Sequence, residues 1–169
     1  MRKLINAVFI AIGVLMINPV VAQKFGYIDT QSIIQDLPEV KEANSNIETF
    51  KKQLQNKGQE MLKAWQTKYQ NLERRQAQGE IAPKELEVEA QKLKDEENGI
   101  ILFEQQSQAK IGKKSEELLS PIRDKIQQAI DSVADENGYT YIFDFSTGFV
   151  LYADQSADVS SLVKKKLGL

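Results

Sequence analysis

The chain has 169 residues, of which 41% are hydrophobic, 27% charged and only 8% aromatic, a balance that favours long solvated helices over a thick globular core. It contains no cysteine and no histidine, which excludes disulfides, thiolate nucleophiles, imidazole bases and zinc sites of the usual Cys/His type. The 22 basic and 24 acidic residues give a net charge of −2, which argues against nucleic acid as a partner.

The first segment has the pattern of a secretory signal peptide, which we place at residues 1–22. Arg2 and Lys3 form a positive n-region, an apolar stretch runs from Leu4 to Ile17, and small or medium residues lead to a cleavage site after Ala22. The alternative is a retained membrane anchor, but the stretch is shorter than the roughly 20 residues that span a bilayer. Cleavage would leave 20 basic and 24 acidic residues, a net charge of −4, and an exported chain without cysteine fits the periplasm.

Residues 23–38 are predicted to form the first strand and a short helix of a small body. The run from Phe25 to Asp29 is short and β-prone. The stretch after it carries Ile33, Ile34 and Leu37 before Pro38, which is expected to end the helix.

Residues 39–119 are predicted to form a long antiparallel helical hairpin, which we call the arm. The apolar residues of its first half follow steps of three, four and seven, close to a coiled-coil seam. They are Ile47, Phe50, Leu54, Met61, Trp65, Tyr69 and Leu72. Gly58 interrupts this seam, and the pattern stops near 77–83, where Gly79 suits a helix end and Pro83 a helix start. A first helix from Val40 to Gln78 would be roughly 58 Å long.

The second half of the arm has a sparser seam. Polar residues stand where a firm seam would be apolar, at Glu97, Glu104 and Ser107. In contrast, Ile100 to Phe103 are four consecutive apolar residues, which cover every side of a helix. Some of them therefore cannot face the partner helix and are expected to face another subunit or a cavity.

Residues 120–169 are predicted to return to the body. Ser120 and Pro121 have the pattern of a new helix start, followed by the densest apolar stripe in the chain, up to Val133. A β-hairpin is then expected from residues 140–145 and 149–152, with Tyr141, Phe143 and Phe145 on one face, and a last helix after Asp158. The two β-prone ends must meet, because a lone hairpin is marginal in water.

The two end segments resemble the Skp/OmpH family of periplasmic chaperones. The residues that carry the resemblance are Lys24 to Asp29 with Ile33 and Ile34, then Asp135 to Tyr139, the aromatic strand that ends at Asp144, Phe149 to Tyr152, and Asp158-Val159. The resemblance implies an α-dominant α+β fold, in which a small β-body carries a long coiled-coil-like hairpin. It also implies a jellyfish-shaped homotrimer that holds unfolded outer-membrane proteins between its arms without ATP. The family is described as basic, with positive arm tips. The mature charge of −4 departs from this and argues against contact of the tips with membrane or lipopolysaccharide.

The resemblance and the apolar pattern together suggest two sets of functional residues. Candidates for client contact on the arm are Phe50, Met61, Trp65, Tyr69, Ile101 and Phe103. For the seam positions among them, the alternative is that they only join the two arm helices. Candidates for the core of the body and trimer are Phe25, Tyr27, Ile28, Tyr141, Phe143, Phe145, Phe149 and Leu151.

No catalytic constellation is present in the sequence, and we expect neither an enzyme nor a cofactor. Residues 111–115 superficially resemble a phosphate loop, but position 107 is serine where the motif needs glycine. The sequence therefore favours a periplasmic holdase chaperone. The alternatives are a coiled-coil spacer or scaffold of the cell envelope without clients, and an accessory subunit of one folded partner.

Overall fold

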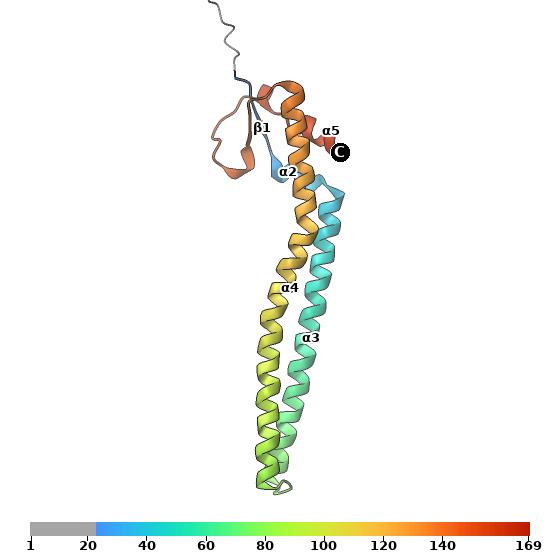
Figure 1. The fold of residues 1–169 in the computed structure, drawn as a ribbon, viewed down its shortest axis with the longest axis vertical. Helices are drawn as coiled ribbons and strands as arrows, with labels where there is room; N and C mark the ends of the chain where they lie inside the picture. Colours follow the sequence, from blue (N-terminus) through green and yellow to red (C-terminus); the bar gives the residue numbers. More distant parts are fainter. Residues whose placement is uncertain (1–22) are drawn as a thin grey trace, which may run out of the picture.

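The computed structural model describes residues 23–169, and the segment expected to be a signal peptide lies outside them. Figure 1 shows a long helical hairpin with a small body at one end. The expected fold is confirmed in its main features, since long helices dominate and one small sheet accompanies them. The trimeric state remains a prediction.

The body brings the two ends of the described chain together through a two-stranded parallel sheet. Strand β1 (Phe25–Ile28) pairs with β2 (Tyr141–Asp144), so that residue 25 lies opposite residue 141 and residue 28 opposite residue 144. At Gly26, strand β1 comes close to the Tyr139 side chain, because a Cβ at this position would stand only 3.1 Å from the Tyr139 ring. The sheet can therefore pack tightly on the chain behind it.

The core lies on one side of this sheet. Helices α2 (Thr30–Asp36) and α5 (Ser160–Leu167) pack there against the C-terminal part of the long helix α4 (Pro83–Asn137). The buried residues of this core are Ile28, Ile33, Leu37, Val40, Ile126, Ala129, Val133, Val159, Val163 and Leu167. The dense apolar stripe that ends at Val133 thus stabilises the body by burying its face against both chain ends.

The arm consists of α3 (Pro38–Ala77, 40 residues) and the part of α4 (Pro83–Asn137, 55 residues) that precedes the body. Pro38 does follow the short helix, but it also occupies the first turn of α3, where the missing N–H costs nothing. The reversal lies at residues 78–82, with Gly79 in the left-handed region at φ 68° and Pro83 opening α4. At 1.5 Å per residue, α3 extends for roughly 60 Å.

The structure differs from the expected β-hairpin, because residues 149–152 form no strand. After β2, a 3₁₀ turn (η1, Phe145–Thr147) ends at Gly148 with φ 75°. The Asp144 carboxylate accepts hydrogen bonds from the Ser146 N–H and hydroxyl, which turns the chain out of the sheet. Strand β2 pairs with β1 on one side, and residues 149–152 do not pair with its other side but form a loop on the outside of the body (Figure 1).

The second difference is that no new helix starts at Ser120-Pro121. Helix α4 continues through Pro121, although proline has no N–H to donate to the carbonyl one turn before. Leu118 and Ile122, on either side, stay half-buried on the packed face, and Pro121 itself is exposed. Packing of the neighbouring turns therefore outweighs the lost hydrogen bond.

Candidate functional site: the aromatic face and the arm

The side of the sheet that faces away from the core carries a cluster that we call the aromatic face. Its members are Phe25, Tyr27, Tyr141, Phe143 and Phe145. The Phe25 ring lies 5.8 Å from that of Tyr141 and 6.3 Å from that of Phe143, and both pairs are stacked. Phe25, Tyr141 and Phe143 are each about half exposed, at 48%, 54% and 46%. Of the expected body core, only Ile28 is buried within the single chain.

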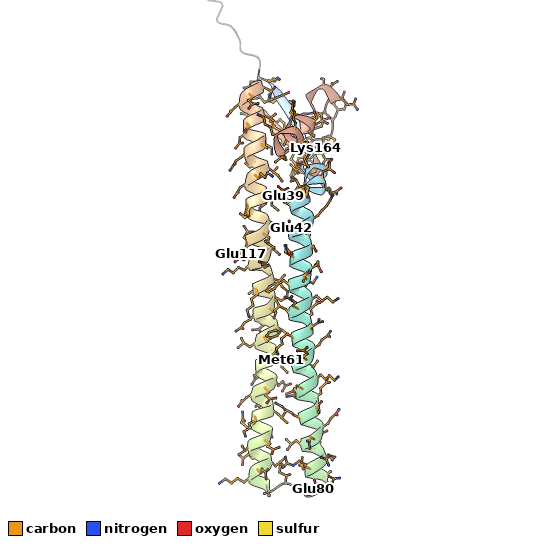
Figure 2. The ribbon with its side chains drawn as sticks, turned by 90° about the vertical axis from the view of Figure 1, so that its right-hand side faces the viewer. Glu39, Glu42, Met61, Glu80, Glu117 and Lys164 are labelled. Carbon is orange, nitrogen blue, oxygen red and sulfur yellow. The ribbon has the colours of Figure 1, made fainter. Side chains whose placement is uncertain are left out.

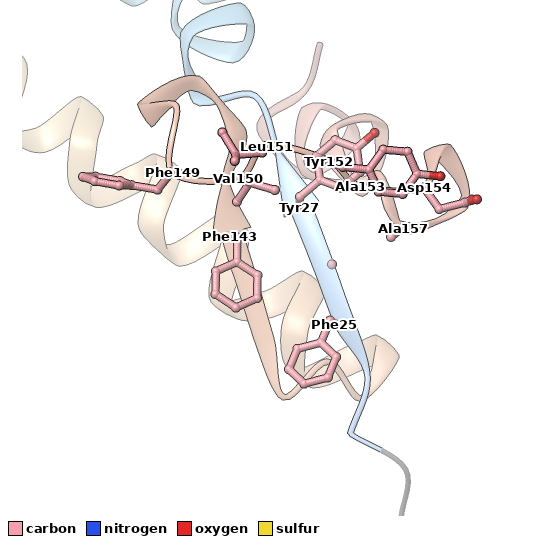
Figure 3. Close-up of a pocket in the computed structure, with 11 residues that line it drawn as sticks. Phe25, Tyr27, Phe143, Phe149, Val150, Leu151, Tyr152, Ala153, Asp154 and Ala157 are labelled. Atoms are coloured by element: carbon pink, nitrogen blue, oxygen red, sulfur yellow. The ribbon is translucent and has the colours of Figure 1, made fainter.

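The 149–152 loop extends this apolar surface. Phe149, Leu151 and Tyr152 are exposed to 90%, 92% and 84% of their maximum. The loop and the aromatic face line an open hollow of about 570 Å³. Figure 3 shows the rings of Phe25 and Phe143 side by side in this hollow, whereas Phe149 points away from it. Such a contiguous exposed apolar surface indicates an interaction site rather than a solvated surface.

A polar joint fixes the position of the sheet at the start of α2. Asp144 accepts a hydrogen bond from the Thr30 hydroxyl at 2.6 Å, in addition to those from Ser146. Burial acts to raise the pKa of the Asp144 carboxyl and is the largest single influence. The hydrogen bonds from Thr30 and Ser146 together outweigh it, so this pKa lies below its usual value. Sequence analysis did not find this joint, because residues 30 and 144 become neighbours only after the sheet forms.

In the middle of the arm, Trp65 joins the two helices. Its indole N–H donates a hydrogen bond of 2.8 Å to the main-chain oxygen of Leu93, and its ring stacks on Tyr69 at 5.3 Å. Phe50 and Met61 are likewise half-buried, and Figure 2 shows Met61 about midway along the arm. For Trp65, this hydrogen bond favours the alternative given above, in which a seam residue holds the hairpin together.

The other arm candidates lie differently. Phe103 is half-buried and faces Gly58, whereas Ile101 and Leu102 are exposed to 49% and 52%. The run from Ile100 to Phe103 therefore contributes to the seam through some members and leaves two large aliphatic side chains in solvent. Together with the exposed Leu62 and Val88, they give the arm scattered apolar positions outside its seam.

The tip of the arm is held by an ion-pair cluster that the sequence did not reveal. Arg75 donates to both oxygens of Glu89 and to Glu85, each at 2.9 Å, and these carboxylates raise its pKa, Glu89 most strongly. Lys68 similarly pairs with Glu96 at 2.6 Å. Acidic residues of α4 thus neutralise part of the basic charge near the reversal, where Figure 2 places Glu80.

Among residues 23–169, no group of three or more acidic residues is arranged to hold a metal ion. Within the same range, no helix is both long and apolar enough to cross a membrane.

The comparisons with known proteins agree with this architecture. The model of the family described as outer membrane protein (OmpH-like) matches residues 24–167, which is nearly all of the described chain. The chain belongs to the OmpH-like family.

A solved structure shares the OmpH-like fold. It is a crystal structure from Caulobacter crescentus, described as that of an outer membrane chaperone (OmpH-like), with a TM-score of 0.74 and 17% sequence identity. The match covers 89% of this chain and 86% of the other, so the body and the arm are both included. No curated protein matches the chain significantly.

Proposed function

We propose that this OmpH-like chain is an ATP-independent holdase of the periplasm, which binds unfolded outer-membrane proteins between the arms of a homotrimer. The observation that carries the proposal is the division of the molecule into two parts. The body leaves an aromatic surface uncovered, and the arm extends for roughly 55 Å beyond the core of the body. The body is thus suited to assembly, and the arm to enclosing another chain.

The uncovered surface supports assembly through the body. The sheet has only two strands, and β2 lies at its edge, where main-chain groups can pair with another chain. The aromatic face and the 149–152 loop lie beside this edge and would be buried by neighbouring copies. Three copies would place three arms around a shared space.

The arm supports weak and reversible binding of a client. Its own seam is thin, since only Ala43, Leu72, Leu93 and Ser107 are buried along it outside the body. The exposed aliphatic residues, such as Leu62 and Ile101, offer separate small apolar contacts. Each would contribute little, so a client could be held by many contacts and still be released without ATP. Residues 111–115 lie inside α4 and therefore form no phosphate-binding loop.

The proposal is tested by dilution of a urea-denatured outer-membrane β-barrel protein into buffer with and without the mature chain, followed by turbidity. We expect the chain to suppress aggregation at about one trimer per client, without nucleotide. A coiled-coil spacer without clients would leave the turbidity unchanged, and this result would refute the proposed function. Lysozyme at the same mass concentration serves as a control for crowding.

A further inference from the structure

Met61 carries the one sulfur atom of the chain that is expected after cleavage of residues 1–22. The full sequence has three methionines, of which Met1 and Met16 lie in the expected signal peptide, and it has no cysteine. After a thiol, a thioether is the side-chain group that mild oxidants most readily oxidise. An oxidant that reaches the mature chain therefore meets a single thioether and no competing thiol.

Met61 lies on the stripe of α3 that contacts α4. It stands one helical turn before Trp65 and three residues after Gly58, so the three residues share one face of the helix. The Trp65 indole donates a hydrogen bond to the main-chain oxygen of Leu93 in α4. A Cβ at Gly58 would lie 3.7 Å from the ring of Phe103, which also belongs to α4. The thioether thus stands between two positions at which the helices of the arm meet.

The position of Met61 in the seam still leaves it open to small molecules. The residue is half-buried and not fully buried. A long side chain on a helix leans back over the preceding turn, which for Met61 contains Gly58. Glycine has no side chain with which to cover the thioether. An open groove of about 700 Å³, lined by Gly58, Leu62 and Phe103 among others, lies at the same level, and a peroxide molecule is small enough to enter it.

Oxidation at this position would place a polar group in a seam that has few buried contacts. Among the described residues of the arm outside the body, the seam buries only Ala43, Leu72, Leu93 and Ser107. A sulfoxide is polar and chiral, and a polar group held at an apolar contact without a hydrogen-bond partner destabilises the fold. Since Trp65 lies in the next turn, the middle of the arm would lose stability first.

We propose that Met61 is an oxidation-sensitive site, at which hydrogen peroxide forms methionine sulfoxide and thereby loosens the middle of the arm. A lone pair of the sulfur attacks one peroxide oxygen, the O–O bond breaks, and the products are the sulfoxide and one water molecule. The sulfur loses two electrons and the peroxide gains them. Methionine sulfoxide reductases reverse the step with a thiol as reductant, so the change is reversible. The inference concerns the stability of the arm and does not depend on the proposed function.

The first test is the reactivity of Met61 in the folded protein. The full mature chain is treated with dilute hydrogen peroxide, and peptide mass spectrometry follows the gain of about 16 Da at Met61. The same treatment in urea gives the rate for the unfolded chain. We expect the rate in the folded chain to lie within about ten-fold of this reference, because susceptibility follows exposure. A Met61 that reacts in urea but stays intact in the folded chain would overturn the inference.

The second test is the effect of oxidation on the arm. Urea unfolding followed by Trp65 fluorescence should give a midpoint about 0.5–1 M lower for the oxidised chain than for the untreated chain. Met61→Leu, measured before and after the same treatment, should keep its midpoint, which excludes an effect of peroxide on the tryptophan. The matched control combines Met61→Leu with Leu102→Met and so moves the single thioether to a position that is 52% exposed. This double variant should gain the oxygen without a change of midpoint.

Equal midpoints for the oxidised and untreated original chain would overturn the inference. Equal shifts for the original chain and the double variant would overturn it too, since oxidation would then act without regard to the seam. Treatment of the oxidised chain with the reductases for both sulfoxide epimers should restore the midpoint together with the mass. A mass that returns while the midpoint stays low would show lasting damage to the fold, and the site would not be reversible as proposed.

Discussion

Leu93 is the position at which we expect the seam of the arm to be most sensitive. Its side chain is 8% exposed, and its main-chain oxygen accepts the indole hydrogen bond of Trp65. Leu93→Ala should lower the free energy of unfolding of the arm by about 2–3 kcal/mol. This is the lower end of the range for buried leucines, because a hairpin two helices thick can close part of the cavity. With a denaturant dependence of about 2 kcal/mol per molar urea, the unfolding midpoint would fall by about 1 M.

The assay uses a probe that the chain already contains. Trp65 is its single tryptophan, so urea unfolding followed by tryptophan fluorescence reports on this part of the arm. The emission of the folded Leu93→Ala variant should also move to longer wavelength, since water gains access to the indole. Leu102→Ala is the matched control, because this leucine of the same helix is 52% exposed and its loss should change stability by about 0.5 kcal/mol or less.

Equal midpoints for the two variants would refute the reasoning. The arm would then not be held by the Trp65–Leu93 layer, and its stability would have to come from helix propensity and surface ion pairs alone. A large loss for Leu102→Ala would instead show that this side chain is covered in the assembled protein.

Four further outcomes are expected. Protein recovered from the periplasm should begin at Gln23, and mass spectrometry that finds the intact leader there would contradict the signal peptide. Light scattering should give three times the mature mass. The variant Phe143→Asp should instead fold as a monomer, because the Phe143 ring is 46% exposed in the single chain and a charge at this position would be costly only where the assembly buries it. Replacement of residues 70–91 by a short Gly-rich turn, which removes about 12 Å of both arm helices in register, should preserve the trimer and reduce protection of large clients more than of small ones. Lastly, the pKa of Asp144 is lowered on folding, so its contribution to stability is complete above the unfolded value of about 3.9 and is lost as the pH falls through the folded value. Thermal midpoints measured from about pH 5 to 2 should therefore fall less for Asp144→Asn than for the original chain, and parallel curves would show that the joint contributes nothing.

The sequence by itself determined the features that depend on neighbouring residues. The reversal could be placed from Gly79 and Pro83, because a left-handed turn and a helix start have local requirements. The shared face of Tyr141 and Phe143 followed from strand alternation, and the helical arm followed from the period of its apolar residues. The resemblance at the two chain ends indicated the family, which the comparison confirms.

Only the tertiary structure decided what depends on residues far apart in the chain. The partner of β2 is β1, more than a hundred residues earlier in the chain, and no local pattern gives the parallel register of this pair. Helix α4 continues through Pro121 because its neighbours pack on the body, a contribution that local proline rules omit. In the sequence, Gly58 interrupts the apolar pattern of the first arm helix, and Ser107 is a polar residue in the apolar pattern of the second. That both line one groove between α3 and α4 depends on the register of the two arm helices, which side-chain packing along the whole hairpin sets.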